Sequence, residues 1–333
     1  MKKISLETNP TEEIVTNNLN LLLQLSALKA SKILEDLDVF SLLNRPRSPE
    51  EIFHMLNFNT LDHEFQLLYE ILAEMGLLTR QGEFYSEPPN RSKKQEYLET
   101  ELEEEENELI KPFYPILDRI SSKYKAIIRG EYGKLINKEF LEMMDSLYGS
   151  EFFFQIRELM FKCIATRLPI FDRQDKITII NFGVGSGYEA LHIADFFGEK
   201  VSITSIEPDE EINRCFVLQD LYEIYNVDFI KQSEIDITSF ENKVDLLIIN
   251  RVQLSRNIKK LIPIIQKVLN EEGYLAISFL PQLSLALDWG LGIYRQNEYL
   301  FMKDEMIAKL KHFGFSRMKF IGMNNDFVAL QKA

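Results

Sequence analysis

The stretch Ile177-Thr-Ile-Ile-Asn-Phe-Gly-Val-Gly-Ser-Gly187 decides the fold class of this chain. Its first six residues are mostly apolar and β-branched, which is typical of a buried strand. Three glycines follow at alternate positions, and they let the backbone turn tightly and approach a ligand without a Cβ in the way. Residues 188–197 then have helical spacing. Strand, glycine turn and helix in this order predict the ligand-binding corner of a doubly wound α/β domain.

The rest of the C-terminal part alternates strand-like and helical segments. Strands are predicted over 201–206, 227–231, 244–250 and 273–279, with a helix from about 257 to 270. Residues 314–321 and 327–331 are predicted to form a closing antiparallel hairpin. We therefore expect one α/β domain over residues 174–333.

Residues 1–90 have the pattern of a winged-helix domain. Helices are predicted over 11–38, 48–56 and 61–75, followed by a hairpin over 76–85 that turns at Gln81-Gly82. DNA binding is disfavoured, because this part has 7 Lys and Arg against 14 Asp and Glu and its third helix has no basic residue,. The first helix is apolar around most of its circumference, which predicts that a second subunit covers it. We therefore expect a dimerisation domain.

Residues 91–173 are predicted to form a helical connector that contributes to a substrate pocket. A run of glutamates lies near its start, between Glu99 and Glu108. Such a run is usually a solvated helix face or a linker.

The composition of the 333 residues restricts the function further. The net charge of −14 argues against a polyanionic partner such as a nucleic acid,. Cys163 and Cys215 lie far apart, so a disulfide framework and a cysteine zinc site are not expected. No apolar run approaches the ~18 residues that span a bilayer, and the first 20 residues lack the apolar core of a signal peptide. We expect a cytoplasmic protein without a membrane segment.

The second strand ends in Glu207, 20 positions after Gly187. A carboxylate at this point can accept hydrogen bonds from two ribose hydroxyls. Two cofactor classes fit. A nicotinamide dinucleotide requires GxGxxG, but Tyr188 occupies the third glycine position. S-adenosylmethionine (SAM) has no phosphate, and GxGxG suits its amino-acid end.

With its closing hairpin, the chain resembles the SAM-dependent small-molecule O-methyltransferase family that has an N-terminal winged-helix dimerisation domain. Segments 28–33, 72–78, 269–273 and 313–315 match that family as well, so that the resemblance covers nearly the whole chain. It implies a Rossmann-like class I methyltransferase sheet with a closing antiparallel hairpin. It also implies SAM as cofactor, a small-molecule substrate, methyl transfer at oxygen and a homodimer.

The glycine corner and the resemblance together indicate a set of cofactor-binding residues. They are Asn181, Gly183, Gly185, Gly187, Glu207, Glu234, Asp236 and Asn250. Asn181 stands where this class often has an acid. Its amide can accept a hydrogen bond from the cofactor ammonium but cannot neutralise it.

Substrate-binding residues are expected after the fourth strand, after the fifth strand and before the glycine corner. They are Arg251, Gln253, Trp289, Tyr294, Tyr148 and Phe153. Core packing is an alternative explanation of the aromatic cluster around Phe153. Arg251 is expected to pair with an anionic acceptor.

No catalytic base is assigned. Relatives commonly place a histidine after the fourth strand, whereas residues 250–255 contain none. His192 lies in the helix after the glycine corner, where a packed or solvated role is expected rather than a catalytic one. No metal site is expected either.

Two other functions stay open. The missing histidine and Asn181 would suit a catalytically silent SAM-fold subunit that binds a ligand or a partner. A nucleotide-dependent oxidoreductase is the weaker alternative.

Overall fold

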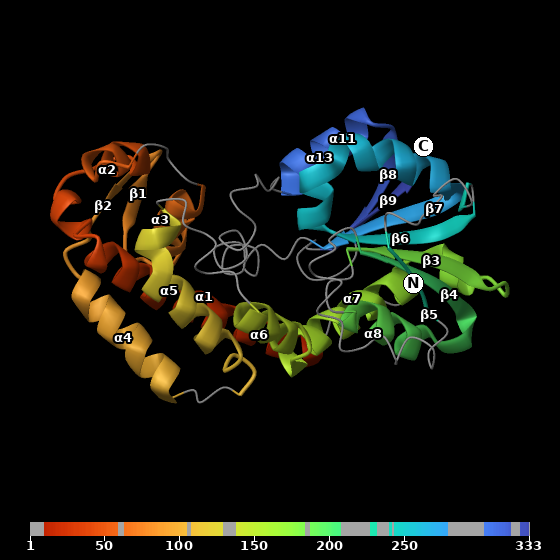
Figure 1. The fold of residues 1–333 in the computed structure, drawn as a ribbon, viewed down its shortest axis with the longest axis horizontal. Coiled ribbons are helices and arrows are strands. Elements are labelled where there is room, and N and C mark those ends of the chain that lie inside the picture. Colours follow the sequence, from red (N-terminus) through yellow and green to blue (C-terminus); the bar gives the residue numbers. More distant parts are fainter. Residues whose placement is uncertain are drawn as a thin grey trace, which may run out of the picture. The chain divides into compact units, whose positions relative to one another are not determined.

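The computed structural model describes residues 10–58, 63–104, 108–128, 138–183, 187–207, 227–231, 240–241, 243–278, 303–320 and 327–332. These residues form two compact units, and the boundary between them lies at Phe152 and Phe153, inside helix α7 (Glu151–Arg167) (Figure 1). The division of the chain at residues 90 and 173 stays a prediction. Among the helices of the described ranges, none is both long and apolar enough to cross a membrane.

The first unit begins with the predicted order of three helices and a hairpin. The elements are α1 (Pro10–Asp36), α2 (Pro49–Met55), α3 (His63–Glu74), β1 (Thr79–Gln81) and β2 (Phe84–Ser86). Ser48 begins α2 through a capping box, in which its hydroxyl accepts from the Glu51 N–H at 3.1 Å and its own N–H donates to the Glu51 carboxylate at 3.0 Å. Each half satisfies one backbone N–H at the helix start. The helices α4 (Arg91–Glu104), α5 (Phe113–Ile127) and α6 (Lys138–Tyr148) follow.

Helix α1 is covered by its own chain. Leu21, Leu22 and Leu23 point in different directions around the helix, yet each is at most 5% exposed. The cover comes from α3, α4 and α5, which all pack against α1. The inference that this helix needs a second subunit to bury it was therefore wrong, because α3 of the same domain and α4 and α5, which follow residue 90, pack against it.

The second unit contains a mixed seven-stranded sheet in the order β5-β4-β3-β6-β7-β9-β8. Its strands are β3 (Ile177–Phe182), β4 (Val201–Glu207), β5 (Val227–Lys231), β6 (Val244–Asn250), β7 (Leu269–Ser278), β8 (Phe315–Phe320) and β9 (Phe327–Lys332). The first five are parallel, and β9 runs antiparallel between β7 and β8. The predicted sheet with a closing antiparallel hairpin is confirmed. Its strand order reverses between β3 and β6, where doubly wound sheets bind ligands.

Helices cover both faces of this sheet (Figure 1). Helices α11 (Arg251–Val268) and α13 (Lys303–His312) pack on one face, together with Ile180 and Phe182 of β3. Helix α8 (Tyr188–Phe197) contacts β4 and β5. Because side chains alternate along a strand, Asn181 points to the face opposite α11.

Two boundaries differ from the prediction. Helix α11 begins at Arg251 rather than near 257, directly after β6, so the expected loop after the fourth strand is helical. Leu254 is fully buried in line with Ile258 and Ile262, so the apolar face starts earlier than the prediction allowed,. Strand β7 likewise begins at Leu269, with an irregular register opposite Val244 to Leu246.

Candidate functional site

Three residues that are predicted to bind the cofactor lie next to one another at the carboxyl edge of the sheet. Phe182 pairs with Ile206 in β4 and with Ile249 in β6. Gly183, Glu207 and Asn250 are the next residues of their strands, so they lie side by side at this edge. The Gly183 N–H donates to the Ile206 carbonyl at 2.8 Å, which holds the chain in register one residue past β3.

The glycines of the corner are needed for their backbone conformation. Gly183 has φ 80° and Gly187 has φ 89°, values that other residues rarely adopt,. Gly187 begins α8 without a side-chain cap. The first N–H groups of α8 are therefore directed toward the carboxyl edge, where the helix dipole favours a negative group.

Two buried polar side chains lie beside each other just before this corner. Asn181 is 1% exposed and Ser205 is fully buried, and the two residues are paired across β3 and β4. Neither the Asn181 Nδ2 nor the Ser205 hydroxyl has a hydrogen-bond partner among the described residues. A buried unsatisfied polar group costs about 1–3 kcal/mol, so natural proteins retain few of them. These atoms fit a site that receives a polar ligand, such as the amino-acid end of SAM.

Two residues of opposite charge, Arg157 of α7 and Glu189 of α8, interact electrostatically near the start of α8, and sequence reasoning missed them. Arg157 of α7 is only 9% exposed. Burial lowers the pKa of its guanidinium to about 10, and Glu189 and Tyr188 oppose that change. Burial likewise raises the pKa of the Glu189 carboxyl to about 7, and Arg157 opposes the rise. The available signal was a lone arginine at helical spacing between the aromatic residues of α7.

His192 is packed, as predicted. Its ring stacks on Phe154 with centroids 4.1 Å apart at 5°, and the edge of Phe161 lies 5.1 Å away. Burial, and to a smaller extent nearby Arg157, lower the pKa of His192 to about 4. The imidazole is therefore neutral at pH 7 and belongs to the contact between α7 and α8.

The other predicted residues divide into two groups. Arg251 and Gln253 lie in the first turn of α11, beside Asn250 at the end of β6. Gly185, Glu234, Asp236, Trp289 and Tyr294 lie outside the described residues.

The aromatic residues before the corner are partly core. Phe152 packs edge-on against Phe113 in the first unit, with ring centroids 4.9 Å apart. Phe153 is 9% exposed, and Tyr148 is half-buried at the end of α6. The packing explanation holds for Phe152.

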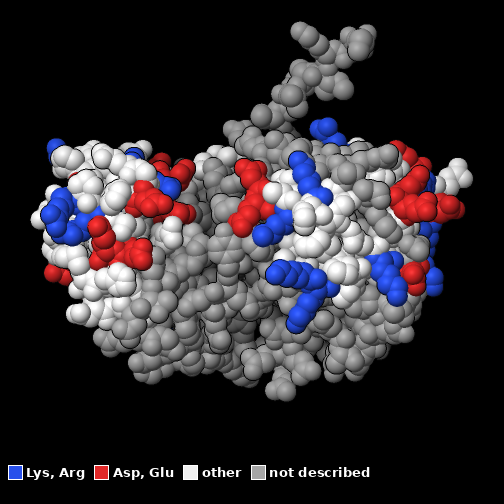
Figure 2. Space-filling model, turned by 90° about the horizontal axis from the view of Figure 1, so that it is seen from above, with Lys and Arg blue, Asp and Glu red and all other residues white. Residues whose placement is uncertain are grey.

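Helix α11 is strongly basic. It carries Arg251, Arg256, Lys259, Lys260 and Lys267 and no acidic residue. Figure 2 shows lysine and arginine side chains on the face seen from above, with acidic side chains among them. The dipole of α11 adds a partial positive charge at its start, which favours anions.

A scan against protein-family models finds no match, and neither does a search of curated protein sequences. Solved structures do match. The chain superposes on the DszA carbon methyltransferase with TM-score 0.64 at 15% identity, over 97% of this chain and 91% of the other. The CurJ carbon methyltransferase gives 0.60 at 16% identity, over 97% and 98%.

A family 2 O-methyltransferase protein from Planctomyces limnophilus, solved in complex with apigenin, gives TM-score 0.52 at 14% identity, over 98% and 97%. The chain has the fold of SAM-dependent methyltransferases. Identities of this size concern the fold, which extends over both units. The expected class I methyltransferase fold with its N-terminal helical domain is confirmed.

Proposed function

We propose that this protein transfers a methyl group from SAM to a small-molecule acceptor, at an oxygen atom. The observation that carries the proposal is the alignment of Gly183, Glu207 and Asn250 at the carboxyl edge, where the strand order reverses. The orphaned Asn181 amide beside them supports a polar ligand. The methyltransferase fold supports SAM rather than a dinucleotide.

The residues of this edge would hold the cofactor along its length. Glu207 would accept hydrogen bonds from the two ribose hydroxyls, and the backbone at Gly183 and Gly187 would allow close approach. Asn181 would bind the amino-acid end, and Asn250 would contribute from the end of β6. When bound, SAM supplies a methyl group on a positively charged sulfur. The protein's task is to hold an acceptor oxygen in line with that group, and such orientation supplies much of the rate.

Arg251 would favour an acceptor that is already anionic. General-base help is typically worth ~10²–10⁴-fold, and residues 250–255 offer no histidine for it,. A guanidinium at the start of α11, on a helix without acidic residues, stabilises a phenolate or carboxylate instead,. Gln253, Tyr148, Phe153, Trp289 and Tyr294 stay predictions for the rest of the pocket.

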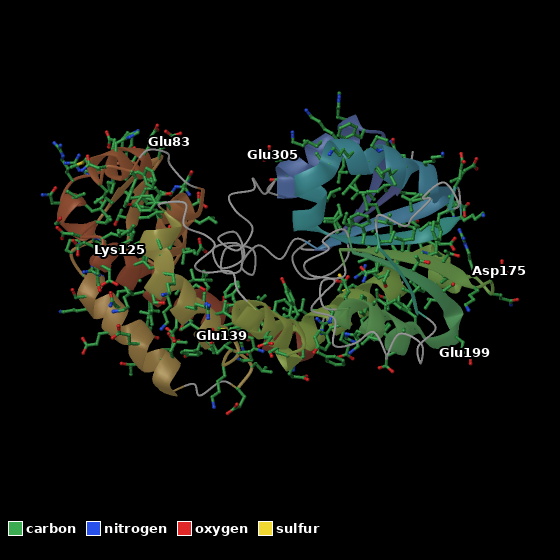
Figure 3. The ribbon with its side chains drawn as sticks, viewed as in Figure 1. Glu83, Lys125, Glu139, Asp175, Glu199 and Glu305 are labelled. Atoms are coloured by element: carbon green, nitrogen blue, oxygen red, sulfur yellow. The ribbon has the colours of Figure 1, made fainter. Side chains whose placement is uncertain are left out.

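The cofactor is tested by calorimetry with SAM, S-adenosylhomocysteine and NAD. We expect binding of the first two and none of NAD. Glu207→Ala should weaken SAM binding at least tenfold, because hydrogen bonds to a charged group are worth about 1.5–3 kcal/mol each. Glu199→Ala is the matched control, since Glu199 is an exposed glutamate just before the opposite end of β4 (Figure 3). Tight NAD binding without a response to SAM would contradict the proposal.

The acceptor is tested with a panel of phenols and carboxylic acids. Arg251→Met should abolish methylation of anionic acceptors and leave SAM affinity nearly unchanged. Arg256→Met, one turn later on α11, is the control. Normal turnover by Arg251→Met would mean that this arginine is structural.

A catalytically silent subunit is the second candidate, favoured by the amide at 181 and the absence of a histidine in 250–255. It predicts SAM binding with no methylated product from any acceptor in the panel.

A homodimer stays a prediction from the family resemblance. Light scattering should report twice the chain mass of 39.0 kDa at micromolar concentration. A monomer there would contradict it.

A further inference from the structure

The contact between α7 and α8 directs one charged residue toward the start of α8. Phe154 and Phe161 of α7 both touch His192 of α8. Arg157 lies between them, three residues after the first and four before the second, on the same face of the helix. Its charge interacts with Tyr188, Glu189 and His192, which all lie in the first turns of α8.

The position of Glu189 relates this pair to the glycine corner. Glu189 is two residues after Gly187, the residue at which α8 begins without a side-chain cap. Glu189 is partly shielded from solvent, and the positive charge that interacts with it is that of Arg157. Glu189 therefore follows the glycine corner directly, and Asn181 with its unsatisfied amide precedes the same corner in β3.

Keeping two charges here is costly. Desolvation of each ion costs several kcal/mol, and well-packed apolar residues of similar size are often at least as stable as a buried pair. The neighbouring contact between α7 and α8 is made by aromatic rings, so the helices have apolar material to hold them together. A charge pair retained beside the ligand corner points to a ligand that carries both charges.

We infer that Arg157 and Glu189 bind the amino-acid end of SAM. Arg157 binds the carboxylate of SAM, and Glu189 binds its ammonium group. The inference rests on the proposed function. In this arrangement Glu189, eight residues after Asn181, supplies the negative charge that Asn181 cannot provide. The Asn181 Nδ2 then donates to the same carboxylate. The zwitterion of the ligand presents a group of opposite charge to each of these two side chains.

Three ligands separate the two contacts by calorimetry. SAM has both charged groups, decarboxylated SAM keeps only the amine, and 5′-methylthioadenosine has neither. Wild type should bind SAM at least tenfold more tightly than either of the others. Arg157→Met should weaken SAM binding 10- to 100-fold and leave the other two affinities unchanged. Glu189→Gln should weaken SAM and decarboxylated SAM and leave methylthioadenosine unchanged.

Glu158→Gln is the matched control, because Glu158 is the neighbouring acid on α7 and pairs with Lys162 at 2.8 Å. It should leave all three affinities unchanged. If Arg157→Met does not fold, Arg157→Lys takes its place, with a smaller loss that is again confined to SAM.

The outcomes distinguish this inference from the proposed function. A wild type that binds none of the three ligands contradicts SAM binding itself. A wild type that binds SAM, with variants that keep its full preference for SAM over methylthioadenosine, overturns only the roles of Arg157 and Glu189. Equal loss of all three ligands in both variants also overturns them, because it identifies the pair as a structural support of the corner.

Discussion

Buried polar groups at the two ends of the sheet in the second unit differ in their hydrogen bonding. At the amino end, Asp245 is 8% exposed and has three hydrogen-bond donors. Its carboxylate accepts from Arg173 at 3.0 Å, from Asn270 at 2.6 Å and from the Thr178 N–H at 2.8 Å. At the carboxyl end, the equally buried Asn181 has an amide nitrogen without a partner among the described residues.

This difference separates the end of the sheet where hydrogen bonds add stability from the end where we propose that a ligand binds. The Asp245 network ties β3, β6 and the start of β7 together with charge-assisted hydrogen bonds. The carboxyl end tolerates unsatisfied or desolvated groups in Asn181, Ser205 and the Arg157–Glu189 pair. Such costs are typical of sites whose geometry serves binding. Substitutions at the amino end should therefore change stability alone, and those at the carboxyl end should change affinity.

Asp245→Ala should have the largest effect. It leaves the Thr178 N–H and the Asn270 amide without their acceptor, at about 1–3 kcal/mol each, while Arg173 keeps only the exposed Glu272 among the described residues,. Urea unfolding should report this loss, while SAM affinity measured on the folded protein stays unchanged. A large loss of affinity would mean that the two ends of the sheet are not independent.

The second effect is on the pH dependence of stability. His192 has a folded pKa of about 4 against an ordinary 6.5, so it removes stability as pH falls from 6.5 to 4,. Glu189 has a folded pKa of about 7 against 4.5, so it removes stability as pH rises from 4.5 to 7,. Between pH 4.5 and 6.5 the two slopes, each at most about 1.4 kcal/mol per pH unit, offset one another.

Two variants separate these slopes. Relative to wild type, His192→Phe should lose about 2–3 kcal/mol as pH rises through that window. Glu189→Gln should lose a similar amount as pH falls. Arg157, Glu158 and Asp195 also face His192 and are present in every variant compared. Variant curves parallel to wild type would contradict both shifts.

A pair of amides gives the third comparison. Asn181→Leu removes a group with an unsatisfied N–H, so stability should stay level or rise, while SAM affinity falls about tenfold. Asn270→Leu removes the partner of Asp245, so stability should fall by about 1–3 kcal/mol with affinity unchanged,. The reverse assignment would overturn the contrast between the two ends.

The smallest effect is expected from Glu272→Ala. Glu272 pairs with the same Arg173 at 2.7 Å, but its side chain is 74% exposed. Exposed pairs contribute about 0–1 kcal/mol, so urea unfolding should change little. A loss as large as that of Asp245→Ala would mean that burial is not what makes the Asp245 network strong.

Much of the second unit was predictable, because its signals are local. The β-branched run before Gly183 gave β3 with its observed ends, Ile177–Phe182, and apolar spacing gave α8 as Tyr188–Phe197. Glu207 and Asn250 follow from the rule that parallel strands bring their carboxyl ends to one edge. The sequence did not predict the start of α11 at Arg251, because a single apolar residue such as Leu254 does not define the apolar face of a helix.

The sequence by itself determined most of the elements and the glycine corner, since these depend on neighbouring residues. Only the tertiary structure decided which distant residues meet. It brought α4 and α5 over α1, Arg157 beside Glu189, and Asp245 to the Thr178 N–H 67 positions away. The physical reason is that an apolar or charged pattern predicts which side of an element is buried. The partner on that side depends on how elements far apart in the chain pack together.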